Sequence, residues 1–282
     1  MILVTGATGT IGREVMSRLG PEAEVRVLAR EPRRVDTVSG AVEVVRGDYG
    51  DPRSLEYALR GVLGVFLVTA RVGGRDDADF LRAARSAGVR HVVKLSAAAV
   101  TDSGADDLIT RWQRDTEELL VGSGMDWTLL RPRSFMSNTL SWAGSIRAEG
   151  VVRVLYGSSA NACVDPRDIA DVAVRTLTEP GHEGRAYTLT GPEAITAHEQ
   201  TAQLSEVLGR PVRCEELEPE QARARWGERY PADVVEALLG SAGRQRDGAK
   251  LRVEDTVREV TGVPARSFRE WVRDNVAAFG PR

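Results

Sequence analysis

The chain has 282 residues, a size at which a single hydrophobic core stops growing, so we expect one large domain with a smaller attached lobe. Hydrophobic residues make up 42% of the chain, charged residues make up 28%, and the net charge is −3, values that are typical of a globular protein without a basic surface for nucleic acid. No apolar run approaches the roughly 18–20 residues of a membrane span, and no basic leader precedes Ile2, so we expect a cytoplasmic protein that binds neither membrane nor nucleic acid.

The first half of the chain alternates short apolar runs with amphipathic stretches. The apolar runs predict strands at residues 2–5, 25–29, 42–45, 65–69, 91–95 and 127–130, and the amphipathic stretches predict helices at 11–19, 52–59, 76–87 and 107–121. The apolar runs are rich in Val, Ile and Leu and hardly alternate with polar residues, as in strands that are buried on both faces. This order of elements predicts a doubly wound parallel sheet covered by helices.

The alternation of apolar runs with amphipathic stretches changes after Pro132. Strands are expected at 151–155 and 186–189, and helices at 168–177, 196–208, 221–226, 232–239, 253–261 and 268–278. Asp168 and Thr196 are predicted helix N-caps, and Glu199 completes a capping-box pattern after Thr196. The glycine-rich stretch 240–248 is the expected mobile loop. We expect a core domain over residues 1–150 and a lobe mainly over 151–282, with some segments returning to the core.

The cysteines and histidines are scattered along the chain. Cys163 and Cys214 do not have the close spacing of metal ligands, and the same holds for His91, His182 and His198. We therefore expect no metal site. Two isolated cysteines are typical of ordinary thiols in a reducing compartment, and a disulfide between them stays open as an alternative.

A glycine-rich turn follows the first predicted strand and opens the first predicted helix. Gly6 allows a tight turn, Gly9 lets the backbone approach a pyrophosphate, and Gly12 allows the helix to pack closely against the strand. The helix N-terminus offers free N–H groups and a partial positive charge to the phosphates, whereas a plain tight turn is the alternative. The predicted dinucleotide site consists of Gly6, Ala7, Thr8, Gly9, Thr10, Ile11 and Gly12.

The end of the second predicted strand bears on the choice of dinucleotide. Sites that are specific for NAD usually place a carboxylate there, which accepts a hydrogen bond from the ribose 2′-hydroxyl. This chain has Arg30 instead, followed by Arg33 and Arg34, and a guanidinium matches the oxygens of a 2′-phosphate. We therefore expect NADP(H) to be preferred over NAD(H). A solvated basic loop stays an equal alternative for Arg33 and Arg34.

Polar residues also follow the later strands, at the edge where ligands bind in open parallel sheets. Asp48 follows the third strand and is expected to accept a hydrogen bond from the adenine amino group, with a turn-forming role as the alternative. Thr69 and Ala70 end the fourth strand, and Ser96 follows the fifth. All four are predicted cofactor-binding residues.

Over nearly its whole length, the chain resembles the NmrA-like family of atypical short-chain dehydrogenases/reductases. The resemblance covers residues 5–12, 28–30, 45–48, 92–96 and 123–132, then Phe135, Met136 and Asn138, and finally 164–170 and 189–192. It implies an α/β fold, a Rossmann-like doubly wound parallel sheet with a small C-terminal α+β substrate lobe, and NAD(P) binding. The family includes NADPH-dependent quinone reductases and redox-sensing regulators without turnover, so the resemblance alone does not decide the function.

The catalytic Tyr-x-x-x-Lys dyad of the wider superfamily is absent from this sequence. None of its five tyrosines is followed four residues later by lysine, and alignment on Glu117 places Thr110 and Arg114 in the two positions. Threonine is a poor acid at neutral pH, and arginine does not release its proton. Reduction of an isolated ketone needs a good acid, whereas reduction of a quinone or enone delocalises the new charge.

We therefore expect an NADPH-dependent oxidoreductase that delivers hydride to a flat, conjugated carbonyl or quinone-like small molecule, acting as a monomer or homodimer. Ser96 is the expected partner of a substrate oxygen, and Arg131 or Arg133 is expected to stabilise developing negative charge. Arg114 can hold a ribose. The alternatives are a satisfied strand-end hydroxyl for Ser96 and pairing with a buried carboxylate for Arg131.

The substrate pocket is expected in the second half of the chain. Its predicted lining residues are Phe135, Met136, Asn138, Trp142 and Tyr156, of which the aromatic residues and Met136 would form an apolar wall. Ordinary core packing is the alternative for such residues.

Two other functions stay open because the dyad is missing. A dinucleotide-sensing regulator would bind the cofactor tightly without turnover. A redox-neutral epimerase, isomerase or dehydratase would turn over its substrate without net consumption of NADPH.

Overall fold

The computed structural model of this protein describes residues 1–35 and 42–280. The chain divides into two compact units, each assembled from three separate stretches. The first unit contains Met1–Ala97, Arg111–Pro132 and Pro166–Thr188, and the second contains Ala98–Thr110, Arg133–Asp165 and Leu189–Arg282. The boundary expected near residue 150 falls within the second unit, and the segment that follows Asp165 returns to the first.

The first unit is built on a seven-stranded sheet with the order β3-β2-β1-β4-β5-β6-β8. The strands are β1 (Ile2–Thr5), β2 (Val25–Ala29), β3 (Val42–Arg46), β4 (Gly64–Leu67), β5 (His91–Leu95), β6 (Asp126–Pro132) and β8 (Arg185–Leu189). Neighbouring strands from β3 to β6 pair in parallel. The strand order reverses at β1, which lies between β2 and β4, and such a reversal marks the ligand-binding crevice in doubly wound folds. The predicted doubly wound parallel sheet is confirmed.

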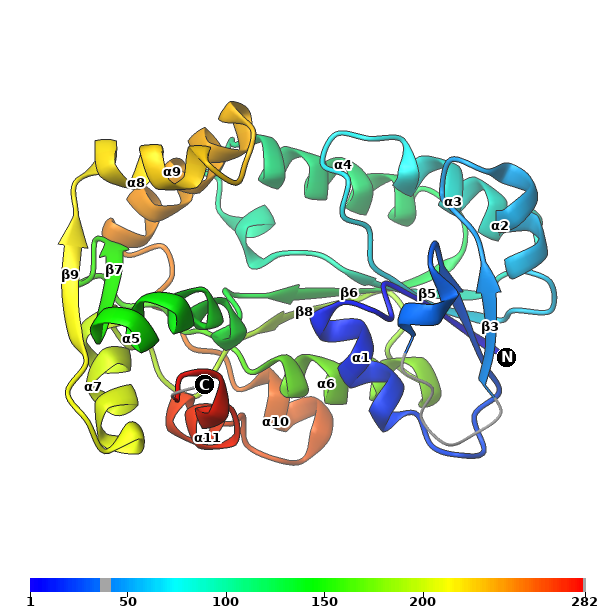
Figure 1. The fold of residues 1–282 in the computed structure, drawn as a ribbon. Coiled ribbons are helices and arrows are strands. Elements are labelled where there is room, and N and C mark those ends of the chain that lie inside the picture. Colours follow the sequence, from blue (N-terminus) through cyan, green and yellow to red (C-terminus); the bar gives the residue numbers. More distant parts are fainter. Residues whose placement is uncertain (36–41, 281–282) are drawn as a thin grey trace. The chain divides into compact units, whose positions relative to one another are not determined.

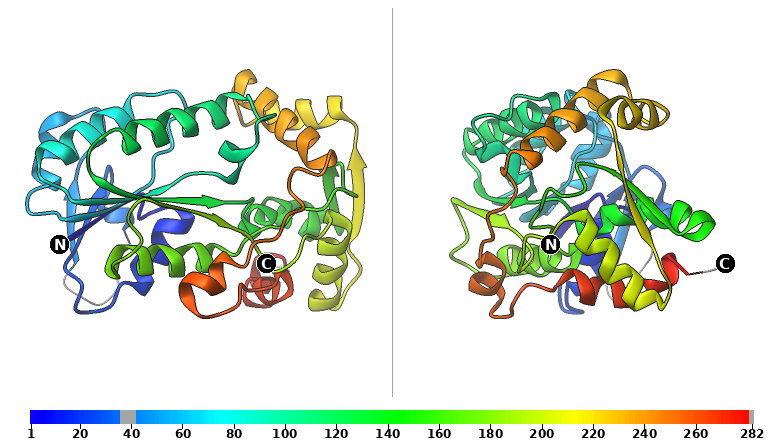
Figure 2. Two further views of the ribbon diagram at one scale, coloured as in Figure 1. Left: turned by 180° about the vertical axis from the view of Figure 1, so that it is seen from behind. Right: turned by 90° about the vertical axis from the view of Figure 1, so that its left-hand side faces the viewer.

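Helices cover both faces of this sheet. They are α1 (Thr10–Arg18), α2 (Pro52–Ala58), α3 (Asp76–Ser86), α4 (Leu108–Val121) and α6 (Pro166–Thr178). α1 and α6 lie together on one face, and α2, α3 and α4 lie on the other (Figures 1 and 2). Arg18 of α1 and Asp171 of α6 form an ion pair of 2.6 Å between Nε and Oδ1.

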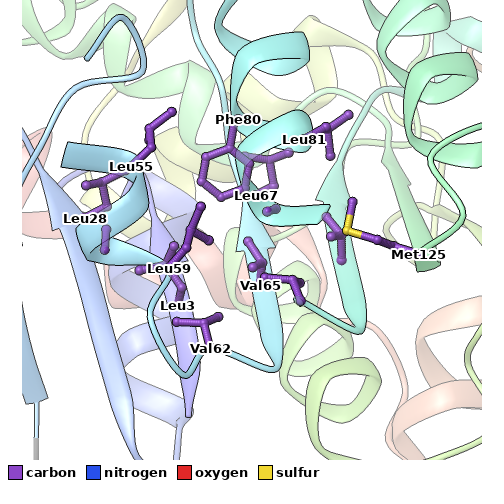
Figure 3. Close-up of a cluster of buried hydrophobic side chains, with 14 of the residues drawn as sticks. Leu3, Leu28, Leu55, Leu59, Val62, Val65, Leu67, Phe80, Leu81 and Met125 are labelled. Atoms are coloured by element: carbon purple, nitrogen blue, oxygen red, sulfur yellow. The ribbon is translucent and has the colours of Figure 1, made fainter. Parts of the chain in front are cut away.

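The hydrophobic core of the first unit explains why the apolar runs form strands. Leu3 of β1, Val65 and Leu67 of β4 and Phe80 of α3 are fully buried and lie in one cluster (Figure 3). Each such side chain contributes about 1.5–3 kcal/mol when it leaves water. Because these strands carry apolar side chains on both faces, they are stable only with helices on each side of the sheet.

The second unit contains a two-stranded parallel sheet and most of the remaining helices. Its elements are β7 (Val151–Leu155), β9 (Arg213–Leu217), α5 (Ala143–Glu149), α7 (Ala197–Leu208), α8 (Pro219–Gly227), α9 (Ala232–Arg246), α10 (Thr256–Thr261) and α11 (Phe268–Asp274). Short 3₁₀ segments lie at Ala98–Thr101, Met136–Trp142 and Val276–Ala278, and a further one lies at Pro32–Arg34 in the first unit. Ile146, Val152, Leu204, Phe268 and Trp271 belong to its core.

Some local predictions for the second half were wrong. The mobile loop expected at 240–248 is largely helical, because α9 runs through Gly240 and Gly243 to Arg246. A glycine inside a helix costs about 1 kcal/mol relative to alanine and does not by itself end the helix. Asp168 is not an N-cap, since α6 already begins at Pro166. The capping box of Thr196 and Glu199 is confirmed.

In the described part of the chain, no helix is long and apolar enough to cross a membrane. Over the same residues, no group of three or more His, Cys, Asp or Glu side chains is placed to hold a metal ion. Cys163 and Cys214 are free thiols.

Candidate active site

The glycine turn has a left-handed backbone at Gly6 that favours glycine. Gly6 has a φ of +65°, and Gly9 N donates a hydrogen bond of 2.8 Å to Gly6 O. A Cβ atom on Gly12 would lie 2.2 Å from Gly6 O, far inside van der Waals contact. α1 begins at Thr10 without a side-chain cap and without an acidic residue in its first turn. The N–H groups at the start of α1 are therefore available to phosphates, and the geometry fits a dinucleotide.

Some residues of this turn pack into the core, and others are exposed to solvent. Ala7, Ile11 and Gly12 are buried, whereas Gly9 and Thr10 are exposed at the start of the helix. Exposure at the helix N-terminus is what a ligand of the backbone N–H groups requires.

Arg30 follows β2, the strand that pairs with β1, and its side chain is exposed. In residues 1–35 and 42–280, neither Arg30 nor Arg33 has an ion-pair partner, whereas Arg34 pairs with Glu31 at 3.5 Å. Arg30 thus keeps a full set of guanidinium donors for an anionic ligand.

The loop after β3 is held by its own hydrogen bonds. Asp48 Oδ1 accepts from Gly50 N at 2.9 Å, which is the turn-forming alternative for this residue. Tyr49 donates its hydroxyl to Val68 O at 2.7 Å, and burial raises the pKa of Tyr49 well above its usual value. Tyr49 therefore remains protonated and has a structural role.

Thr69 lies two residues after the end of β4 and is bound to a buried aspartate that was not among the predicted site residues. Thr69 Oγ1 donates to Asp77 Oδ1 at 2.6 Å, and Trp112 Nε1 donates to Asp77 Oδ2 at 2.9 Å. Lys94 Nζ lies 4.0 Å from the same carboxylate and 5.7 Å from the centre of the Trp112 ring. Ala70, the next residue, is exposed. Asp77 therefore fixes Thr69 relative to α3 and α4.

Lys94 is fully buried in the middle of the sheet. Its Nζ donates to Leu95 O at 2.6 Å and to Gln113 Oε1 at 3.3 Å. Burial lowers the pKa of Lys94 to about 8, and Asp77 opposes this shift. A lysine inside the apolar run 92–95 was the signal for this network, because a strand buried on both faces must bury that side chain too.

Ser96, Glu117 and Arg131 form a second buried network in the first unit. Ser96 Oγ donates to Glu117 Oε1 at 2.5 Å. Arg131 binds the same carboxylate in a bidentate manner, with Nε 3.0 Å from Oε1 and Nη2 2.5 Å from Oε2. Ser96 and Arg131, two of the three predicted catalytic residues, are thus joined by Glu117, and the pairing of Arg131 with a buried carboxylate is the alternative that was left open for it. Arg131 Nη1 makes no bond to Glu117, and 22% of the side chain remains exposed.

The two residues that occupy the dyad positions lie on α4. Arg114 is half-buried on the part of α4 that belongs to the first unit. Thr110 belongs to the second unit, where its N and Oγ1 donate to Asp107 at 3.0 and 2.8 Å. Thr110 is therefore engaged in capping the helix.

The predicted pocket residues all lie in the second unit and differ in exposure. Met136 is 2% exposed and belongs to the core of the unit, and Trp142 packs against that core. Phe135 is half-buried and Asn138 is exposed. Tyr156 has a φ of +53°, and the Arg246 guanidinium lies 5.0 Å from the centre of its ring.

Comparison with known proteins agrees with this geometry. The sequence model of a family described as NAD(P)H-binding matches residues 6–180. The chain is 58% identical, over 100% of both chains, to the (4-alkanoyl-5-oxo-2,5-dihydrofuran-3-yl)methyl phosphate reductase of Streptomyces griseus. It is 40% identical, over 99% of both chains, to the NAD(P)H azoreductase of Xenophilus azovorans.

A solved structure of a reductase with bound NADPH is also similar to this chain. The NADPH complex of an NADPH-dependent quinone oxidoreductase from Escherichia coli superposes with a TM-score of 0.86 at 27% identity, over 98% of this chain and 100% of that one. The chain belongs to the NAD(P)H-binding family, within the NmrA-like oxidoreductases, as the sequence predicted. It is an NAD(P)H-dependent oxidoreductase of the reductase type.

Proposed function

We propose that this protein uses NADPH to reduce the conjugated C=C bond of a small, flat acyl-furanone that carries a phosphate ester. The substrate class follows from the relative that is 58% identical over the full length of both chains. Such a ring places one carbon–carbon double bond next to two carbonyl groups, the ring lactone and the alkanoyl group.

The site chemistry supports a conjugated acceptor. NADPH supplies the hydride when it is bound. Addition at the ring carbon that bears the phosphomethyl group leaves an enolate, whose charge is shared by the two carbonyl oxygens. The neighbouring carbon then takes a proton from solvent, so no strong acid is required of the protein. This agrees with the absence of the Tyr-x-x-x-Lys dyad.

The single observation that carries this proposal is the Ser96–Glu117–Arg131 network. Glu117 holds the Arg131 guanidinium in place, while Arg131 Nη1 keeps its donors for the oxyanion of the substrate. Ser96 already donates to Glu117, so its oxygen is left to accept a hydrogen bond. Arg114 is proposed to contact the cofactor ribose. Glu117 is thus a positioning residue, and Arg131 is the residue proposed to contact the reacting group.

The preference for NADPH over NADH is also proposed, on the basis of Arg30. Its exposed guanidinium follows β2 and has no ion-pair partner among the described residues, so a 2′-phosphate can bind there. Gly6 to Gly12 are proposed to hold the pyrophosphate, and Asp48, Thr69, Ala70 and Ser96 to line the rest of the cofactor site. We further propose a cytoplasmic monomer or homodimer, which suits the two free thiols.

The test is a panel of acceptors with NADPH oxidation followed by the absorbance of the nicotinamide. An acyl-furanone phosphate and a simple quinone are expected to be reduced, whereas an isolated ketone is not. Tight NADPH binding without oxidation by any acceptor would instead favour a sensor. Turnover of a substrate without net NADPH consumption would favour a redox-neutral enzyme.

A further inference from the structure

The second unit contains a polar network that the proposed hydride transfer does not use. Asn161 is 6% exposed, and its Nδ2 donates to Ser134 Oγ at 2.9 Å and to Gln245 Oε1 at 3.3 Å. Gln245 Nε2 donates to Ser159 O at 2.8 Å, and Gln245 Oε1 accepts from Lys250 Nζ at 3.4 Å. A continuous chain of hydrogen bonds therefore joins Ser134 to Lys250.

A cation lies at each end of this chain. Lys250 Nζ donates to Ser241 Oγ at 2.9 Å, and burial lowers the pKa of Lys250 to about 8. Arg133 precedes Ser134, and its buried Nε makes no hydrogen bond within the described part of the chain. Arg133 lies close enough to Lys250 for its charge to contribute to this lowering of the lysine pKa. In the residues that the structure describes, no carboxylate is within 4.0 Å of either cation.

The carboxylates of the neighbourhood are already bound to other cations. Arg244 Nη2 lies 2.6 Å from Asp107, and Arg244 Nε lies 3.4 Å from Asp102. Arg252 lies 2.7 Å from Glu254. Arg133 and Lys250 are therefore two neighbouring positive charges without a close counter-ion, an arrangement that is unfavourable in a partly buried place unless an anion binds there. Both side chains remain partly exposed, so an anion can reach them.

We propose that Arg133 and Lys250 form the subsite for the phosphate ester of the substrate, with Ser241 and Gln245 holding the Lys250 ammonium in position. This assignment rests on the proposed function, because it needs a phosphorylated substrate. A phosphate monoester is close to a dianion at neutral pH, which matches two cations. Arginine offers paired donors to phosphate oxygens, and lysine offers a compact charge. Among the described residues, the buried Oδ1 of Asn161 has no hydrogen-bond partner.

The specificity of the subsite is tested with Lys250→Met and Arg133→Gln. Each variant is expected to lower kcat/KM for the acyl-furanone phosphate by about 10- to 100-fold, the loss that follows from removing a hydrogen bond to a charged group. The values for the dephosphorylated counterpart and for a simple quinone are expected to change by no more than about twofold. Arg252→Gln is the matched control, since it removes a cation that is paired with Glu254. Lys250→Arg keeps the charge and is expected to rescue most of the activity.

The same variants separate this proposal from its alternatives. Equal losses with phosphorylated and dephosphorylated acceptors would overturn the subsite. A raised Kd for NADPH in Lys250→Met would also overturn it, because the cations would then serve a cofactor phosphate. If no acceptor is reduced, the proposed function fails while the subsite is still tested, by calorimetry with phenyl phosphate on the NADPH-saturated protein. Binding that is lost in Lys250→Met would retain the phosphate subsite, and no binding to the unmodified protein would reject it.

Discussion

Glu117 of α4 and Arg131 of β6 form a bidentate ion pair, and Ser96 donates to the same carboxylate. A single buried side chain therefore sets the position of both polar groups that we propose at the reacting end of the cofactor. Glu117 acts through these two residues, because its carboxylate oxygens are occupied by them.

Glu117→Gln is expected to lower kcat for quinone reduction by about 10- to 100-fold, since a neutral amide no longer holds the guanidinium through two charge-assisted bonds. The Kd for NADPH is expected to stay within about threefold of the original value. Steady-state kinetics and a fluorescence titration of NADPH measure the two quantities. Glu118→Gln, an exposed neighbour on the same helix, is the control. An unchanged kcat in Glu117→Gln would show that the Glu117–Arg131 ion pair does not position Arg131 for the reaction.

Arg30→Ala is expected to raise the Kd for NADPH by about 10- to 100-fold and to leave the Kd for NADH within about twofold, because only NADPH carries a 2′-phosphate. Calorimetric titration of each dinucleotide measures this difference. Arg34→Ala serves as the comparison, since Arg34 is paired with Glu31. If both dinucleotides weaken equally, Arg30 does not distinguish between them.

Gly12→Ala is expected to abolish binding of both dinucleotides and to lower the free energy of unfolding by at least about 1–3 kcal/mol, because the new methyl group would collide with Gly6 O. Gly20→Ala is the matched control, as no atom of the residues that the structure describes lies within 4 Å of the added Cβ. Urea unfolding and dinucleotide titration of the two variants test the close approach of Gly12 to Gly6 O. Normal NADPH binding by Gly12→Ala would contradict the geometry of the turn.

The pH dependence of KM follows from Lys250. Burial, together with the charges of Arg244 and Arg133, lowers its pKa to about 8, while Cys163 and Asp107 act in the opposite direction. The ammonium is present below this pKa and is lost as the pH rises through it. KM for the phosphorylated acceptor is therefore expected to rise above about pH 8, by up to about tenfold per pH unit, while KM for the dephosphorylated acceptor stays flat.

The control for this pH profile is Lys250→Arg, whose guanidinium stays protonated. It is expected to give a flat KM for the phosphorylated acceptor over the same range. If KM for the phosphorylated acceptor still rises with pH in Lys250→Arg, a group other than Lys250 titrates. That result would contradict the role proposed for Lys250.

The sheet and the glycine turn were predictable because their signals are local. An apolar run that does not alternate predicts a strand buried on both faces, and glycine spacing after such a strand predicts the turn. β9 was not predicted because its sequence, Arg-Cys-Glu-Glu-Leu at 213–217, is mostly charged and three of its five residues are exposed. The helical course of α9 through Gly240 and Gly243 depends on packing that a glycine count does not reveal.

The networks of the candidate site were less predictable, because they depend on how separate elements meet. Ser96 and Arg131 were expected at the site, but their shared partner Glu117 is fixed by the way in which α4 lies on the sheet. Lys94 carried a sequence signal, as a charge within an apolar strand, whereas its partner Asp77 did not, since acidic residues are common in the first turn of helices. The partial exposure of Arg133, and its lack of an ion-pair partner among the described residues, likewise required the structure.

The most direct test of the central claim uses NADPH that carries deuterium at the hydride position of the nicotinamide, together with an alkanoyl-furanone phosphate. Mass spectrometry and NMR of the product locate the transferred deuterium. Reduction of the conjugated double bond predicts one deuterium on the ring carbon that bears the phosphomethyl group. Deuterium on the side-chain carbonyl carbon, or a product without deuterium, would contradict it.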